Sequence, residues 1–212
     1  MIKRIETGGI GWLEPLRGSS EWLYGSDYTD GDLYEAEELY RDGHTINKTR
    51  LIFVRRTDGA VREPVTARVG QYFGRPVWEA GKIIILLADF PEERIRLLAY
   101  CGENDTLETV VTIPGKSVED CYNLMPVGSP LSLTRQAGNR FQVIWPEQAD
   151  FEIGSSESFC FRDGDRLYFS KWFEDPDYRE EVVVRALNTG EILEQYPGSL
   201  MFHPDGQIWL LV

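Results

Sequence analysis

The sequence predicts an all-β protein built from repeated antiparallel sheets. Twenty glycines and eleven prolines are spread along the 212 residues, which indicates many turns and therefore many short strands. Helical periodicity is scarce, and segments that read as apolar strand, turn and apolar strand recur along the chain. A chain of this length is long enough for one large domain, or at most two small ones, and we expect a single domain.

The longest copies of the repeat align when their leading glycines, Gly31, Gly81 and Gly164, are superposed. Each copy reads as an apolar strand, a polar loop, a second apolar strand, a turn and a third strand. Gly81 and Gly164 are 83 residues apart, which leaves room for two units of about 40–45 residues. Gly31 and Gly81 are 50 residues apart, which fits one unit with a longer loop.

The turns of these copies have the composition of hairpins. They contain residues 58–59, 103–105 and 188–190, in which Gly, Asn and Asp adopt positive φ at low cost. The periodicity of residues 33–41 also fits a helix with Leu33, Ala36, Leu39 and Tyr40 on one face, but the alignment of the copies favours a strand there.

Shorter hairpins recur between the long copies and at the end of the chain. They lie at residues 21–24, 76–78, 131–145, 158–161 and 199–211. We therefore predict five four-stranded sheets, over residues 19–67, 74–115, 128–156, 157–198, and 1–18 plus 199–212. Because the copy at 128–156 is short, four sheets are the alternative count.

The two chain ends support a ring that closes on itself. Each end alone is half a sheet with unpaired edges, which are costly, so we expect residues 1–16 to pair beside residues 199–212. The phrase His203-Pro204-Asp205-Gly206 followed by an apolar strand resembles the turn of WD-like and YncE-like β-propellers. This resemblance covers most of the chain and implies a small β-propeller. A two-sheet β-sandwich is the main rival fold.

The charge of the chain excludes several classes of partner. The formal net charge is −13, with 35 acidic against 22 basic residues, so neither nucleic acid nor an anionic membrane is an expected partner. The N-terminus lacks the apolar segment of a signal peptide, and we expect a cytoplasmic protein. Three widely spaced cysteines match neither a disulfide framework nor a zinc site, and no cofactor motif is recognised.

An acidic segment is the first candidate binding site. Asp27, Asp30, Asp32 and Glu35 lie close together in sequence, and hard cations such as Ca²⁺ need several oxygen ligands from one turn. The spacing matches no known calcium loop, so a solvated turn is the favoured interpretation and no metal site is predicted.

Three glutamates are the candidate catalytic residues. Glu21, Glu79 and Glu157 lie on the strands predicted to line the central channel, one from each of three sheets. Five-bladed glycosidases use converging carboxylates in such a channel. However, a chain with 35 acidic residues produces such triplets by chance, so the enzyme hypothesis is the weaker one.

Six tryptophans recur roughly once in each predicted sheet, and such repeated aromatics can form a sugar-binding platform. Packing between neighbouring sheets is the more common role and is favoured here. Taken together, the sequence favours a monomeric, non-enzymatic interaction module that binds a protein or peptide partner through one propeller face. A lectin-like propeller and a glycosidase-like hydrolase are the alternatives.

Overall fold

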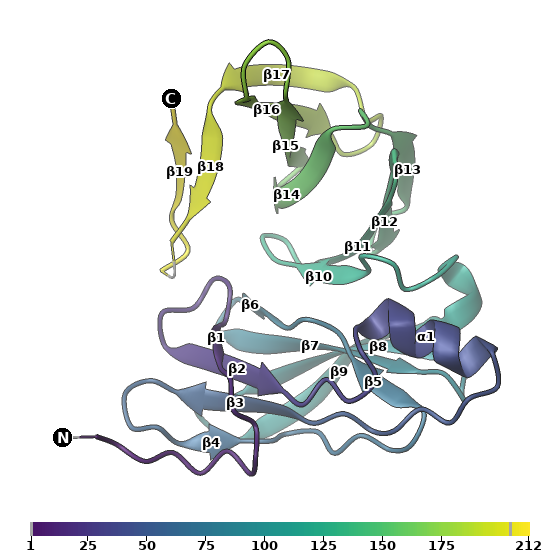
Figure 1. The fold of residues 1–212 in the computed structure, drawn as a ribbon, viewed down its shortest axis with the longest axis vertical. Helices are drawn as coiled ribbons and strands as arrows, with labels where there is room; N and C mark the ends of the chain where they lie inside the picture. Colours follow the sequence, from purple (N-terminus) through teal and green to yellow (C-terminus); the bar gives the residue numbers. More distant parts are fainter. Residues whose placement is uncertain (1, 204) are drawn as a thin grey trace. The chain divides into compact units, whose positions relative to one another are not determined.

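The computed structural model describes residues 2–203 and 205–212, and these are mostly β-strands. The chain divides into two compact units, residues 1–121 and 122–212 (Figure 1). Among the described residues, each unit contains two antiparallel sheets of four or five strands, and the second unit adds a two-stranded sheet. The predicted fold class is confirmed at the level of its class and its building blocks: the protein is all-β and is built from small antiparallel sheets.

The first sheet of the first unit has the strand order β1-β2-β3-β4 and is antiparallel throughout. A nine-residue helix, α1, lies in the connection between β2 and β3. The elements are β1 (Glu14–Pro15), β2 (Trp22–Ser26), α1 (Leu33–Arg41), β3 (Leu51–Arg55) and β4 (Val61–Arg62).

The second sheet of this unit has the order β5-β7-β8-β9, and β6 also pairs with β7. The central strand β7 reads KIIILLAD and is buried on both faces, which explains its continuous run of apolar residues. A short 3₁₀ helix, η1, follows β9. The elements are β5 (Gln71–Phe73), β6 (Val77–Glu79), β7 (Lys82–Asp89), β8 (Arg94–Cys101), β9 (Thr106–Pro114) and η1 (Gly115–Ser117).

The second unit contains two four-stranded meanders and a terminal hairpin. The first meander is β10 (Met125–Val127), β11 (Ser132–Ala137), β12 (Arg140–Trp145) and β13 (Ala149–Glu152), paired in that order. The second is β14 (Glu157–Asp163), β15 (Arg166–Phe173), β16 (Arg179–Ala186) and β17 (Ile192–Pro197). The hairpin is β18 (Ser199–Phe202) and β19 (Ile208–Leu211).

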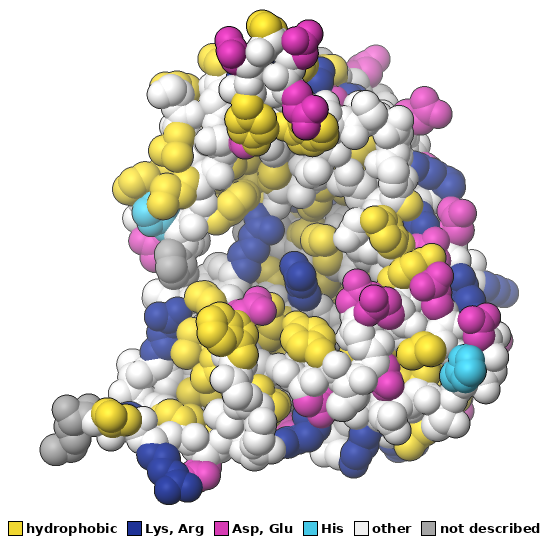
Figure 2. All heavy atoms as spheres, viewed as in Figure 1, with side chains coloured by type: hydrophobic (Ala, Val, Ile, Leu, Met, Phe, Trp, Pro, Cys, Tyr) yellow, Lys and Arg dark blue, Asp and Glu magenta, His cyan; other side chains and the backbone are white. Residues whose placement is uncertain are grey.

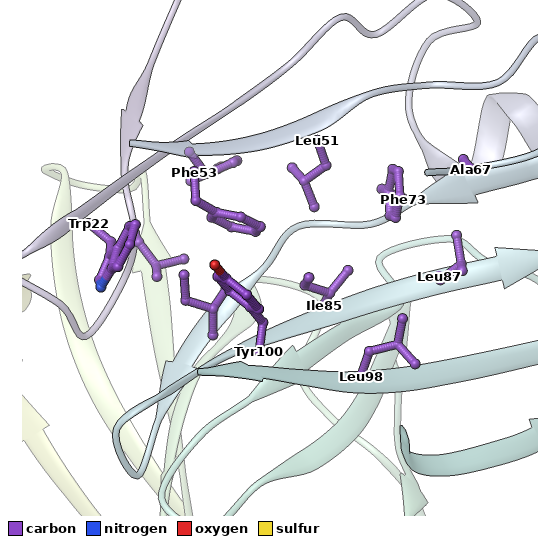
Figure 3. Packing of buried hydrophobic residues seen from close by; sticks show 12 residues of the cluster. Trp22, Leu51, Phe53, Ala67, Phe73, Ile85, Leu87, Leu98 and Tyr100 are labelled. Carbon is purple, nitrogen blue, oxygen red and sulfur yellow. The ribbon is translucent and has the colours of Figure 1, made fainter. Parts of the chain in front are cut away.

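The core of the first unit is made by apolar side chains from both of its sheets (Figure 3). Trp22 and Phe53 come from the first sheet, and Ile85 and Tyr100 come from the second. The rings of Phe53 and Tyr100 are stacked with their centroids 6.5 Å apart. Contacts of this kind hold the two sheets together through burial of large aromatic surface.

The core of the second unit is a cluster of phenylalanines. Phe141 on β12 lies 4.7 Å from Phe159 and 5.1 Å from Phe169, measured between ring centroids. Phe159 and Phe169 are themselves 5.5 Å apart in an edge-to-face arrangement. Because Phe159 and Phe169 belong to the neighbouring meander, this cluster packs the two meanders of the unit against each other.

The prediction of a strand over residues 33–41 is wrong, because the structure has helix α1 there. The Asp32 side chain accepts hydrogen bonds from the backbone N–H groups of Tyr34 and Glu35, and the Glu35 side chain accepts one from the N–H of Asp32. This capping box satisfies backbone donors that otherwise lack partners at a helix start. Leu33 and Ala36 are buried on one face, so the helical periodicity of the segment decides its structure.

The predicted pairing of the two chain ends is also wrong. β18 and β19 pair only with each other among the described residues, while β1 pairs with β2. The N-terminal segment packs against β3, where Ile10 is buried. Gly25 on β2 allows this approach, since a Cβ atom there would lie 2.7 Å from the carbonyl oxygen of Trp12.

The predicted hairpin turns are confirmed. Gly59, Asp105 and Gly190 have positive φ angles of 69°, 56° and 70° in the turns β3–β4, β8–β9 and β16–β17. The turn around His203 and Gly206, which resembles the turn of WD-like and YncE-like propellers, joins β18 to β19. Its Pro204 lies outside the described residues.

Candidate functional site

The first unit contains a cavity of about 390 Å³. Three segments that are distant in sequence line it: the last turns of α1, the β7–β8 connection, and the chain around η1. The lining residues are Glu37, Tyr40, Arg41, Ala88, Asp89, Phe90, Glu93, Arg94, Ile95, Gly115, Lys116, Val118, Glu119 and Cys121. We call this cavity the α1 pocket.

Polar side chains of α1 fix the helix to the segment after η1. The Arg41 guanidinium forms an ion pair of 2.6 Å with Glu37, one helical turn earlier, and donates a hydrogen bond of 3.0 Å to the carbonyl oxygen of Glu119. Glu37 also accepts a hydrogen bond of 2.5 Å from the backbone N–H of Cys121. These contacts order one wall of the α1 pocket.

The β7–β8 connection is fixed by hydrogen bonds of its own. Asp89, which is buried, accepts hydrogen bonds from Gln71 at 2.5 Å and from Arg96 at 2.9 Å. The carbonyl oxygen of Glu93 accepts a hydrogen bond of 2.6 Å from the N–H of Gly115. A Cβ atom at Gly115 would lie 3.0 Å from that oxygen, so glycine allows η1 to approach this turn closely.

Part of the lining of the α1 pocket is apolar and aromatic. Ile95, Val118 and Cys121 are buried, and they contribute apolar surface to the lining. The rings of Tyr40 and Phe90 are stacked with centroids 5.6 Å apart and form an aromatic wall that joins α1 to the β7–β8 connection. Seven of the fourteen lining residues are charged, so the apolar and aromatic surface is one part of a mixed lining.

Charges of both signs lie beside this apolar surface. Arg94 and Lys116 are exposed, and in the described part of the chain neither has an ion-pair partner. Arg41 and Asp89, in contrast, are neutralised by Glu37 and by Arg96. Acidic side chains gather over α1 in the space-filling view (Figure 2). The pocket therefore contains two cations without an ion-pair partner among the described residues, and the carboxylates of Glu93 and Glu119 line it as well.

The one thiol of the pocket is not activated. Burial raises the pKa of Cys121 far above its usual range, and the negative charge of Glu37 raises it further. The thiol therefore stays protonated at neutral pH, whereas a nucleophilic cysteine needs a lowered pKa. Cys121 contributes apolar surface to the pocket.

The second unit contains a smaller cavity of about 230 Å³ beside Gln136 and Phe159. The Gln136 amide donates a hydrogen bond of 2.8 Å to the carbonyl oxygen of Glu157, and its oxygen accepts one of 2.8 Å from the N–H of Phe159. Gln136 thus connects the two meanders of the unit, and its polar atoms are engaged in that connection.

The structure places the predicted acidic residues between the end of β2 and the first turn of α1. Asp32 and Glu35 form the capping box of that helix, and Asp27 accepts a hydrogen bond of 2.9 Å from the N–H of Arg50. One carboxylate oxygen of Asp30 is buried and has no partner among the described residues. Within residues 2–203 and 205–212, no group of three or more His, Cys, Asp or Glu side chains is placed to hold a metal ion.

The three candidate catalytic glutamates lie in different settings. Glu21 is exposed just before β2, Glu79 is half-buried at the end of β6, and Glu157 is buried on β14. Both carboxylate oxygens of Glu157 are occupied, since each accepts a hydrogen bond of 2.9 Å from Arg185. The structure thus gives Glu157 an ion pair within its own sheet, and a catalytic role for the three remains a prediction.

The tryptophans do not occupy equivalent positions. Trp22 is buried in the core of the first unit, while Trp12, Trp172 and Trp209 are exposed. The packing role that the sequence favours therefore holds for Trp22. A sugar-binding role of the exposed tryptophans stays a prediction.

Sequence reasoning did not find the α1 pocket. Its available cations, Arg94 and Lys116, and its aromatic pair, Tyr40 and Phe90, come from three segments that match no motif. The local signal that could have located one wall is the Asp32–Glu35 capping box, which predicts a helix whose last turn carries Tyr40.

No described helix is long and apolar enough to cross a membrane. Comparison with the models of known protein families finds no match, and none is found among curated proteins. A function for this chain is therefore inferred from the chemistry of the α1 pocket.

Proposed function

We propose that this protein is a non-enzymatic recognition module that binds a protein or peptide partner in the α1 pocket. The observation that carries the proposal is a cavity of about 390 Å³ that combines an aromatic and apolar wall with charged side chains. This volume is at the small end of the range for ligand sites, about 300–1,000 Å³, and suits one or two inserted side chains.

The pocket supplies both affinity and orientation for a peptide. Burial of an apolar side chain against Tyr40, Phe90 and Val118 would supply most of the binding free energy. Arg94 and Lys116 would attract a carboxylate of the same peptide, because they have no ion-pair partner among the described residues. The preferred ligand is therefore a segment with an apolar or aromatic residue followed or preceded by an acidic one.

The protonated state of Cys121 supports binding rather than chemistry at this site. A thiol whose pKa is raised by burial is a poor nucleophile, and it packs as a small apolar group. The walls are also held by their own contacts, the Arg41–Glu37 ion pair and the Gly115–Glu93 hydrogen bond. A site that is ordered before binding loses less entropy when the ligand arrives.

A random peptide display library, selected on the immobilised full chain, tests the proposal. We expect enriched peptides that share an apolar residue near an acidic one. Calorimetry should then show that Phe90→Ala and the double variant Arg94→Glu with Lys116→Glu each weaken binding by at least about tenfold. Lys48→Glu is the matched control, since it reverses an exposed charge that does not line the pocket.

Two results would contradict the proposal. One is a selection that enriches no peptide. The other is a set of peptides that bind the pocket variants and the wild type equally, because their site would then lie elsewhere on the protein.

A further inference from the structure

The hairpin β18–β19 is unusually apolar for an exposed element. Met201 and Phe202 on β18, and all four residues of β19, are exposed by 37–49%. The space-filling view shows hydrophobic side chains gathered over this hairpin (Figure 2). The hairpin contacts the preceding meander through Phe202, whose ring lies 5.9 Å from that of Phe161, but its remaining apolar surface is exposed. Exposed apolar surface of this kind indicates a surface that is covered in use.

The outer edge of β19 is available for pairing. β19 pairs only with β18 among the described residues. The N–H of His203 donates to the carbonyl oxygen of Gln207, which makes these two residues a hydrogen-bonded pair of the ladder. Because such pairs alternate along an antiparallel ladder, the N–H and C=O groups of Ile208 and Leu210 point away from β18.

β19 also lacks the features that usually prevent edge-to-edge pairing. The exposed edge strands β9, β13 and β17 each carry an acidic residue, and β9 and β17 also contain a proline. In contrast, β18 reads SLMF and β19 reads IWLL, with neither charge nor proline. Charged residues and prolines are the means by which edge strands avoid pairing with other chains.

We propose that β19 pairs antiparallel with β19 of a second copy of this chain, across a two-fold axis at Trp209. In this register Ile208 of each copy lies opposite Leu210 of the other. The outward N–H and C=O groups of both residues are then satisfied by four hydrogen bonds. The result is a four-stranded sheet, the same number of strands as in both meanders of the second unit.

A second copy fits this edge because each outward N–H group of one β19 meets an outward C=O group of the other. A two-fold axis brings any antiparallel edge against its own image, and uncharged strands do so without repulsion despite the net charge of −13. The four exposed side chains of β19, at about 200 Å² each, present roughly 350 Å² of apolar surface per copy. Two copies thus offer about 700 Å², the size of a weak interface that dissociates on dilution.

The N-terminal segment, which sequence reasoning assigned to this edge, is engaged elsewhere in the chain. Ile10 is buried against Ile52 and Val54 of β3, with Leu13 packed beside them. The N-terminal segment is therefore not the partner of β19, and another chain can pair with that edge.

Analytical ultracentrifugation of the full chain tests the proposal. We expect a species of twice the 24.3 kDa chain mass that dissociates on dilution from about 100 µM to about 1 µM. Leu210→Pro removes an N–H that faces away from β18 and therefore leaves the hairpin its own ladder. It should raise the dimer dissociation constant by at least about tenfold, because it removes two of the four hydrogen bonds. Leu210→Val keeps the N–H group and should remain dimeric.

Cross-linking provides a second readout that does not depend on the proline variant folding. The two Trp209 residues would form a non-hydrogen-bonded pair with Cα atoms about 4.5 Å apart, within the range for a disulfide of about 4.4–6.8 Å. Trp209→Cys should therefore give a disulfide-linked dimer under mild oxidation. Leu211→Cys, two residues further along β19, should not.

Several outcomes would overturn the proposal. They are a wild type that stays monomeric at the highest concentration, larger open assemblies instead of a dimer, and a Leu210→Pro variant that folds and dimerises as well as the wild type. Equal cross-linking of Trp209→Cys and Leu211→Cys would also overturn it. None of these results bears on peptide binding in the α1 pocket, so the two proposals fail separately.

Discussion

At the scale of single residues, buried arginines are the main polar feature of the second unit. Arg162 on β14 is 3% exposed, and it donates hydrogen bonds to Ser132 at 2.6 Å and to both oxygens of Glu147 at 2.9 Å. Arg185 on β16 binds both oxygens of Glu157. A buried charge of this kind is tolerated only because it is paired and hydrogen-bonded.

Replacing Glu157 by Gln should strongly destabilise the protein. The change leaves Arg185 as a buried charge without its counter-ion, which costs about 3–5 kcal/mol in comparable pairs. Urea unfolding measures the difference. The matched control is Glu194→Gln, which removes a half-exposed ion pair with Arg166 and should have little effect. If both variants lost the same free energy of unfolding, the buried Glu157–Arg185 pair would be no more important to stability than an exposed pair.

The Glu147–Arg162 ion pair should make stability depend on pH in the acid range. Hydrogen bonding to Arg162 lowers the pKa of Glu147 below its unperturbed value of 4.5. A carboxyl group with a lowered folded-state pKa stabilises the fold above the unfolded-state pKa, and this contribution disappears as the pH falls through the folded-state pKa.

We therefore expect Glu147→Gln to be less stable than the wild type at pH 7. The two proteins should converge as the pH is lowered below about 4.5, toward the lowered pKa of Glu147. Urea unfolding between pH 7 and pH 3 measures this. A difference that does not change with pH would mean that the glutamate contributes through packing and not through its charge.

At the scale of elements, helix α1 depends on its N-terminal cap. Asp32 accepts two backbone hydrogen bonds at 2.9 and 3.0 Å, and the helix has only nine residues, too few to be stable alone. The cap and the burial of Leu33 and Ala36 therefore support each other. Because α1 forms one wall of the α1 pocket, its cap also matters to the proposed site.

Asp32→Ala should destabilise the protein by about 1 kcal/mol, the usual loss for an N-cap carboxylate. Thermal unfolding measures the change. Asp42→Ala is the matched control at the opposite end of the helix, where a negative charge opposes the helix dipole, so its effect should be neutral or slightly stabilising. Equal destabilisation by both variants would argue against the capping role.

At the scale of the whole molecule, each unit has its own core. The cluster that contains Phe53 and Tyr100 lies in the first unit, and the cluster around Phe141 lies in the second. Truncation of one core should therefore act mainly on its own unit.

Phe53→Ala and Phe141→Ala should each cost about 3–5 kcal/mol, since both side chains are fully buried. Hydrogen exchange followed by mass spectrometry locates the loss. Phe53→Ala should accelerate exchange mainly in residues 1–121 and Phe141→Ala mainly in residues 122–212. Val110→Ala, at an exposed position of β9, should change little. A uniform increase along the chain in both core variants would contradict the assignment of separate cores.

The sequence alone determined the β-rich class and the positions of the hairpin turns. Gly59 and Gly190 mark their turns because positive φ is a local requirement that few other residues meet. The apolar run of β7 predicts a buried strand for the same reason, since the signal lies within one short segment. The capping box of helix α1 is also a local signal. The alignment of the leading glycines nevertheless led to the prediction of a strand there, against the helical periodicity of the segment.

Only the tertiary structure decided the partners of the chain ends and the composition of the candidate site. The edge of β19 and the packing of Ile10 depend on contacts between residues that are far apart in sequence, and strand pairing carries no local signal of its partner. The α1 pocket joins Tyr40, Phe90 and Lys116 from three segments. The arrangement of these side chains follows from the packing of α1 and η1 around the β7–β8 turn, which no single segment encodes.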